Sequence, residues 1–134
     1  MENKSDFYNA SQSRPVSSFE AALGLIEEQI SLAELMQDVY NADIYDEIAR
    51  IIADVYVRNP NNETRIDGEW VTYGYVKEVY SRLTYDHVRE VVDNFNNCRE
   101  YIKFKKAYLR TALFNICFEF HSGITNNLKA AGVI

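Results

Sequence analysis

The 134-residue sequence is poor in the residues that mark specialised chemistry, with two cysteines, two histidines, five glycines and two prolines. Two cysteines do not make the disulfide framework of a small secreted domain. The glycines are scattered, which excludes a glycine-rich phosphate loop. His87 and His121 have no cysteine or carboxylate at a spacing typical of a metal site. We therefore expect no catalytic centre, no metal and no cofactor, and predict that the protein is not an enzyme.

Long hydrophobic runs are also missing. No apolar run approaches the roughly 20 residues that a membrane-spanning helix needs, and residues 1–18 are too polar for a signal peptide. The sequence therefore predicts a soluble, cytoplasmic protein with no membrane partner. Residues 1–18 show no apolar period, which is typical of a flexible lead-in or linker.

Hydrophobic and aromatic residues are plentiful, at 47% and 13% of the chain, and ten residues are tyrosine. This composition and length predict one globular domain with a real core. Cys98 and Cys117 both fall in patterns typical of helices, so we expect both to be small buried side chains.

Apolar residues recur three and four positions apart over most of the chain, which predicts helices. The predicted helices cover residues 19–30, 32–39, 44–57, 73–83, 85–96 and 104–120. Ser31 and Glu34 have the spacing of a capping box for the second helix. Thr72 and Thr84 are predicted caps of the fourth and fifth helices. The run His121–Gly123 is the predicted end of the last helix.

One segment has the pattern of strands. Asp67-Gly68 lies between alternating residues, and this dipeptide suits a type I′ turn because both central positions need positive φ. We expect the hairpin to lean on the helices through Ile66, Trp70 and Val71, with Trp70 as its anchor. The predicted fold class is thus mainly α: a compact bundle of about six helices over residues 19–122, one small β-hairpin at about residues 63–72, and a tail at residues 123–134.

Charge is divided unevenly along the chain. Residues 1–75 carry five basic and fourteen acidic side chains, whereas residues 76–134 carry nine basic and six acidic ones. A chain with a net charge of −6 is a poor non-specific ligand for a polyanion. The basic half can contact nucleic acid locally or dock an acidic partner, or the two halves can complement each other within the fold.

The positive charge is densest in what we call the basic segment, Arg99–Arg110, which has a single acid, Glu100. Our candidate contact residues for nucleic acid or a partner are Arg99, Tyr101, Lys103, Lys105, Lys106 and Arg110. Cations interleaved with aromatic residues are typical of proteins that bind single-stranded nucleic acid. In the alternative interpretation, the lysines solubilise a helix start while Tyr101 and Phe104 pack inward.

Four features follow one another along the chain. They are Asp67-Gly68, the helix Val76–Leu83, Thr84 with His87, and the segment Lys106–Asn115 with the sequence KAYLRTALFN. Together with Ile26–Ile30, Leu35–Tyr40 and Asp46–Val55 upstream, this order resembles the C-terminal domain of the replication initiator protein A family of Gram-positive plasmids and conjugative elements. That domain is similar to the primosome component DnaD. The resemblance covers about residues 25–116, and Lys106–Asn115 is its most specific part.

The resemblance implies a role in replication initiation. A winged-helix domain of such a protein would bind origin DNA, and this domain would recruit host replication proteins (helicase, loader or primase) or make weak contact with DNA. The alternative is a self-associating helical domain, a homo-oligomer whose acidic and basic halves pair head to tail without nucleic-acid contact.

Overall fold

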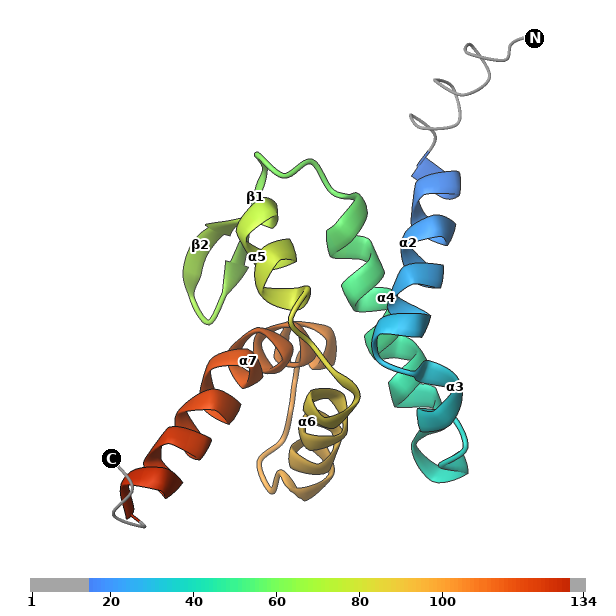
Figure 1. Ribbon diagram of the computed structural model, residues 1–134. Coiled ribbons are helices and arrows are strands. Elements are labelled where there is room, and N and C mark those ends of the chain that lie inside the picture. The colour runs from blue at the N-terminus through green and yellow to red at the C-terminus, as the bar shows by residue number, and fades with distance from the viewer. Residues whose placement is uncertain (1–14, 131–134) are drawn as a thin grey trace, which may run out of the picture.

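The computed structural model describes the backbone of residues 15–130 and the side chains of residues 18–119. The described chain forms six α-helices, one short 3₁₀ helix and one antiparallel hairpin, which confirms the predicted fold class. The elements in chain order are α2 (Pro15–Gln29), α3 (Leu32–Leu35), η1 (Val39–Asn41), α4 (Ala42–Val57), β1 (Glu63–Ile66), β2 (Glu69–Thr72), α5 (Tyr73–Tyr80), α6 (Tyr85–Asn97) and α7 (Lys105–Ala130) (Figure 1). Residues 1–14 of the predicted lead-in and residues 131–134 of the predicted tail lie outside the described residues.

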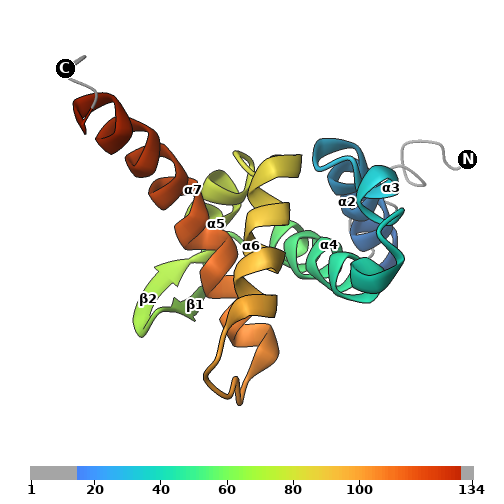
Figure 2. The same cartoon turned by 90° about the horizontal axis from the view of Figure 1, so that it is seen from below.

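Helices α2 and α4 lie side by side (Figures 1 and 2). Their predicted apolar stripes are confirmed, because Ile26, Ile48 and Ile52 are fully buried. Each such side chain contributes roughly 1.5–3 kcal/mol on burial. Helix α2 begins at Pro15, four residues before the predicted start and inside the predicted lead-in. Proline suits a first helical position, because its φ is already helical and its missing N–H would have no intrahelical partner there.

The predicted capping box at Ser31 is wrong. Ser31 is left-handed (φ 55°, ψ 54°) and makes no side-chain capping bond. An N-cap residue needs an extended backbone, whereas a left-handed residue typically ends the preceding helix. Ser31 therefore closes α2, and α3 lasts only four residues before η1 follows. Val39, the last residue of the predicted second helix, is 84% exposed.

The hairpin forms at the predicted Asp67-Gly68 turn, where φ is 54° and 82°. Strand β1 pairs with β2 in the register Ile66 opposite Glu69. Ile66 is buried, and the backbone N–H of Asp67 donates to Thr111 Oγ1 of α7 at 3.4 Å. The hairpin therefore docks its turn on α7.

Trp70 is not the hairpin anchor that we predicted, since 61% of its surface is exposed. It lies opposite Arg65 in the register, and the Arg65 guanidinium stacks 5.1 Å from the centroid of its ring. Alternate residues of a strand face opposite sides. Ile66 lies on the inward side of β1, so the adjacent residue Arg65 lies on the outer side. Trp70 is paired with Arg65 and therefore lies on the outer side too.

Both predicted threonine caps are confirmed. Thr72 Oγ1 accepts a hydrogen bond from the N–H of Tyr75 at the start of α5. Thr84 forms a capping box with His87 at the start of α6. A cap of this kind stabilises a helix by about 1 kcal/mol.

Helix α7 does not end at His121–Gly123 but runs on to Ala130. Glycine inside a helix costs only about 1 kcal/mol relative to alanine, and it ends a helix only where the backbone turns left-handed. The C-terminal part of α7 projects away from the rest of the domain (Figures 1 and 2). No helix in the described chain combines the length and the apolar character needed to cross a membrane.

A set of polar contacts around Gln29 and Tyr80 links α2, α4, α5 and α7. The Gln29 side chain donates to the carbonyl oxygens of Tyr80 and Leu83, at 3.0 and 2.8 Å. Its amide oxygen accepts from the Tyr56 hydroxyl at 3.3 Å. The fully buried Tyr80 in turn donates its hydroxyl to the carbonyl oxygen of Arg110 at 2.8 Å. The core is formed by α4 together with α2, α5, α6 and α7, each of which contributes buried side chains.

Candidate functional site

The basic segment begins in the loop between α6 and α7. Cys98 leaves α6 with an extended backbone, and α7 begins at Lys105. Tyr101 is 89% exposed and Phe104 is 67% exposed. The alternative in which both aromatic side chains pack inward is therefore wrong.

Three of the six candidate residues come together on this loop. Arg99, Tyr101 and Lys103 are all exposed. Lys103 Nζ lies 5.4 Å from the centroid of the Phe104 ring. The loop thus presents two cations and two aromatic rings to solvent.

Lys105 and Lys106 lie on the first turn of α7 and face α4 instead. Lys105 Nζ forms an ion pair with Glu47 Oε1 at 3.0 Å. Lys106 lines a small pocket together with Asp46, Glu47 and Asp54 of α4. The acidic side of α4 therefore compensates these two lysines. This arrangement supports the interpretation in which the acidic and basic halves complement each other.

Arg110 is turned toward the interior. Its Nε atom is buried and has no hydrogen-bond partner among the described residues. Its charge is close enough to act on the hydroxyl of Tyr80, whose pKa is raised by burial and lowered in part by Arg110. Arg110 therefore does not extend the solvent-exposed cations of the loop, although it lies four residues after Lys106.

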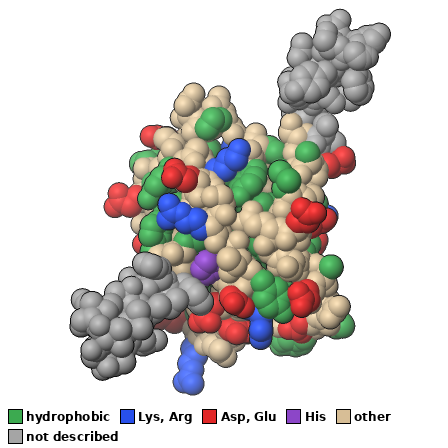
Figure 3. All heavy atoms as spheres, viewed as in Figure 1, with side chains coloured by type: hydrophobic (Ala, Val, Ile, Leu, Met, Phe, Trp, Pro, Cys, Tyr) green, Lys and Arg blue, Asp and Glu red, His purple; other side chains and the backbone are tan. Residues whose placement is uncertain are grey.

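A groove of about 680 Å³ lies beside the loop, and we call it the loop groove. Tyr101, Phe104 and Tyr108 contribute aromatic surface to it. Its charged lining is mixed, with the following described residues: Arg65, Asp67, Glu100, Lys103 and Glu119. Acidic and basic side chains are also interspersed on the face shown in Figure 3. The loop groove therefore lacks the uniform positive charge of a strong phosphate-binding channel.

The two cysteines have different environments. Cys117 is buried as predicted; its Sγ donates to the Val79 carbonyl oxygen at 3.4 Å, and burial raises the pKa of its thiol to about 11. Cys98 is exposed, contrary to the prediction, because it lies just beyond the end of α6. The described residues contain no group of three or more side chains that could hold a metal ion. The side chain of His121 lies outside them.

Comparison with known families gives one match. The model of a family of unknown function, DUF6017, matches residues 8–130. The chain belongs to this DUF6017 family. No protein of curated function and no solved structure matches it.

Thr84 and His87, which are among the features that resemble the replication initiator family, have a structural role in this DUF6017 domain. Nδ1 of His87 accepts from the backbone N–H of Thr84 at 3.1 Å, and Thr84 Oγ1 accepts from the N–H of His87 at 3.2 Å. Burial lowers the pKa of His87, which keeps the ring neutral and able to accept. The pair caps α6.

The DUF6017 domain also has a surface that the sequence analysis missed. A second groove, of about 510 Å³, lies between β2, α5 and α7, and we call it the aromatic groove. Trp70, Tyr75, Phe114 and Phe118 line it. Phe114 and Phe118 are four residues apart and lie outside the Leu109–Leu113–Ile116 stripe of α7, a spacing that could have indicated a second apolar face.

Proposed function

We propose that this DUF6017 domain is a non-catalytic module of a plasmid or mobile-element replication initiator that recruits host replication proteins in the cytoplasm. The resemblance over residues 25–116 supports the replication role. The exposure of Tyr101 and Phe104 carries the interaction role, because a folded domain ordinarily gains stability by burying large aromatic side chains. Two such rings on one short loop favour a contact surface.

Calorimetry tests the recruitment role directly. The full chain is titrated with the helicase, the helicase loader and the primase of a host. We expect saturable binding to one of the three. If none of them binds at concentrations up to about 1 mM, where the binding free energy would be only about −4 kcal/mol, the recruitment role is wrong.

Contact with single-stranded DNA is a second candidate function, and we assign it to the loop. Arg99 and Lys103 are exposed beside Tyr101 and Phe104, so cations can hold phosphates while bases stack on the rings. Lys105 is already paired with Glu47, which makes it a weaker phosphate ligand. The loop cations, rather than those at the start of α7, are therefore the favoured contacts.

Two matched double charge reversals test this assignment. Arg99→Glu with Lys103→Glu changes the loop, and Lys105→Glu with Lys106→Glu changes the start of α7. We expect the loop variant to lose most of the salt-sensitive binding to a single-stranded oligonucleotide in fluorescence anisotropy, and the α7 variant to lose less. Equal losses, or binding that neither variant changes, would contradict the assignment to the loop.

A further inference from the structure

We propose that the aromatic groove is the docking site for a basic amphipathic helix of the recruited protein. This inference rests on the proposed recruitment function and adds a second contact surface, apart from the loop, and the chemistry of the partner that it would bind. The groove differs from the loop in position and in charge.

The groove has a continuous aromatic wall. The rings of Tyr75 and Phe114 meet edge to face at 5.7 Å between centroids, and those of Phe114 and Phe118 lie 5.6 Å apart. Phe114 is half-buried and holds the wall in place, whereas Tyr75 and Phe118 are 45% and 41% exposed. Trp70 of β2 lines the edge of the groove, while its ring stacks on Arg65 on the outer side of the hairpin. A volume of about 510 Å³ accommodates a few apolar side chains, as when a helix lays residues three and four apart into a groove.

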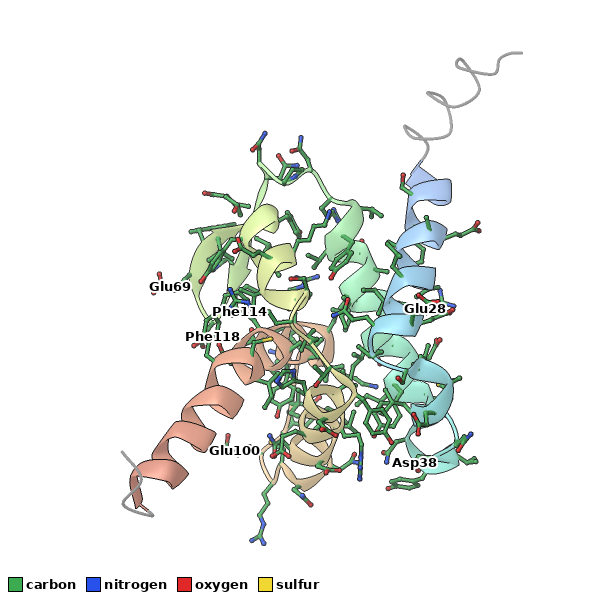
Figure 4. All side chains as sticks on the ribbon, viewed as in Figure 1. Glu28, Asp38, Glu69, Glu100, Phe114 and Phe118 are labelled. Atoms are coloured by element: carbon green, nitrogen blue, oxygen red, sulfur yellow. The ribbon has the colours of Figure 1, made fainter. Side chains whose placement is uncertain are left out.

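Charges at the groove are of one sign. Asp67 and Glu69 line it, and no lysine or arginine does so among the described residues. Arg65 stacks on Trp70 but is already engaged, since its Nη2 donates to the Gly68 carbonyl oxygen at 2.7 Å. Figure 4 shows Glu69 on the hairpin and Phe114 and Phe118 on α7. Apolar walls with an acidic rim favour an occupant with apolar side chains flanked by lysine or arginine.

The same charges disfavour two other occupants. A nucleic acid would bring its phosphates against Asp67 and Glu69, without a cation in the described lining to hold them. A second copy of this chain carries a net charge of −6, and its exposed cations Arg99 and Lys103 lie on a loop and not on an amphipathic helix. A basic segment of a different protein is the occupant that fits both the rings and the charges.

Trp70 makes the proposal directly testable, because it is the single tryptophan of the chain and lines the groove. The probe is a synthetic helical peptide of about 15 residues, near the length at which isolated helices become stable, with leucines three and four apart and lysines elsewhere. The matched peptide has glutamate in place of each lysine. We expect a saturable shift of Trp70 emission to shorter wavelength with the lysine peptide and a much weaker response with the glutamate peptide.

Three variants place the binding on the groove. Glu69→Lys and Phe118→Ala should each lower the affinity for the lysine peptide by about ten-fold. The first variant reverses a charge at the rim, and the second removes an exposed aromatic ring of the wall. Glu28→Lys reverses a charge on α2, on the other side of the domain (Figure 4), and should leave the affinity within about two-fold. Equal affinities for the two peptides, or equal effects of Glu69→Lys and Glu28→Lys, would overturn the proposal.

The groove and the recruitment role can fail separately. If a host protein binds the wild-type chain and the Phe118→Ala variant equally well, the groove is not its docking site, whereas the recruitment role is retained. If the lysine peptide binds the groove but helicase, loader and primase all fail to bind the chain, the groove is confirmed as a helix-binding site and the recruitment role is wrong. Light scattering that shows a dimer broken by Phe118→Ala would overturn the proposed occupant, because a second copy would then fill the groove.

Discussion

Lys105 Nζ lies 3.0 Å from Glu47 Oε1, and this ion pair joins the start of α7 to the acidic side of α4. The two side chains are 48% and 36% exposed, so water screens their attraction. A double-mutant cycle of Lys105→Ala and Glu47→Ala should give a coupling free energy of about 0.2–1 kcal/mol in urea unfolding. The coupling should shrink in about 1 M salt, where screening extends over only a few ångströms. As the matched control, Lys103→Ala and Glu47→Ala should be additive, and a coupling of equal size there would contradict the pairing.

The buried hydroxyl of Tyr80 should contribute measurably to stability. Tyr80→Phe keeps the ring but removes the hydrogen bond to the Arg110 carbonyl oxygen, so the free energy of unfolding should fall by about 1 kcal/mol. Tyr101→Phe removes a hydroxyl from an exposed ring and should change the free energy of unfolding by less than about 0.5 kcal/mol. Urea unfolding of both variants measures the difference, and equal stabilities would show that the Tyr80 bond adds nothing.

His87 should make stability depend on pH on the acid side of neutrality. Because the folded pKa is lowered, the unfolded chain takes up a proton first as the pH falls through the ordinary value of about 6.5. The neutral His87 ring therefore makes its full contribution to the free energy of unfolding above the ordinary pKa. This contribution is lost as the pH falls from the ordinary pKa through the lowered pKa of the folded state.

The matched variant is His87→Gln, because glutamine at this position can keep the capping box but does not titrate. Urea unfolding of both proteins at about pH 7.5 and pH 5.5 isolates the histidine, since all other titrating groups are shared. Wild type should lose more stability between the two pH values than the variant does. Parallel losses would mean that His87 titrates alike in the folded and unfolded chains.

Two glycines should respond to alanine in opposite ways. A Cβ on Gly24 of α2 would meet nothing within 4 Å, so Gly24→Ala should stabilise the domain by about 0.5–1 kcal/mol through helix propensity. A Cβ on Gly74 of α5 would lie 3.2 Å from Pro60 Cβ and 3.3 Å from its carbonyl oxygen, which already accepts from the Gly74 N–H. Crowding against this rigid proline should make Gly74→Ala net destabilising by about 1 kcal/mol. Thermal unfolding of both variants shows whether each stability change has the expected sign. A stabilising Gly74→Ala would show that the loop containing Pro60 moves to make room for the methyl group.

Local signals in the sequence were sufficient for much of the fold. The isoleucine stripe of α4, the Asp67-Gly68 turn and the caps Thr72 and Thr84 each depend on residues only a few positions apart, and all are confirmed. The capping box at Ser31 failed because the same residue types suit the end of one helix and the start of the next. The outward side of Trp70 could not be predicted, because packing of Ile66 near α7 decides which face of the hairpin is buried.

The candidate site was harder to predict for a geometric reason. The cations are divided between a loop and α7, and the groups that surround them come from other elements of the fold. The structure leaves Arg99 and Lys103 on the loop, turns Lys105 to Glu47 and buries part of Arg110. Glu47 lies far away in the sequence, and the basic segment alone gives no sign of it. The aromatic groove was missed for the same reason, since β2, α5 and α7 each contribute to its rings.

The Gln29 amide has a consequence for how the domain opens. The Tyr80 carbonyl oxygen lies at the end of α5, where a helix leaves acceptors without intrahelical partners, and that of Leu83 lies in the link to α6. Gln29 reaches both from the end of α2. Fraying of α5 at this end would therefore disturb the Gln29 contacts, and detachment of α2 would break both of these hydrogen bonds. Local openings of the two helices are thereby coupled, so their backbone amide protons should exchange with deuterated water together, as one cooperative unit.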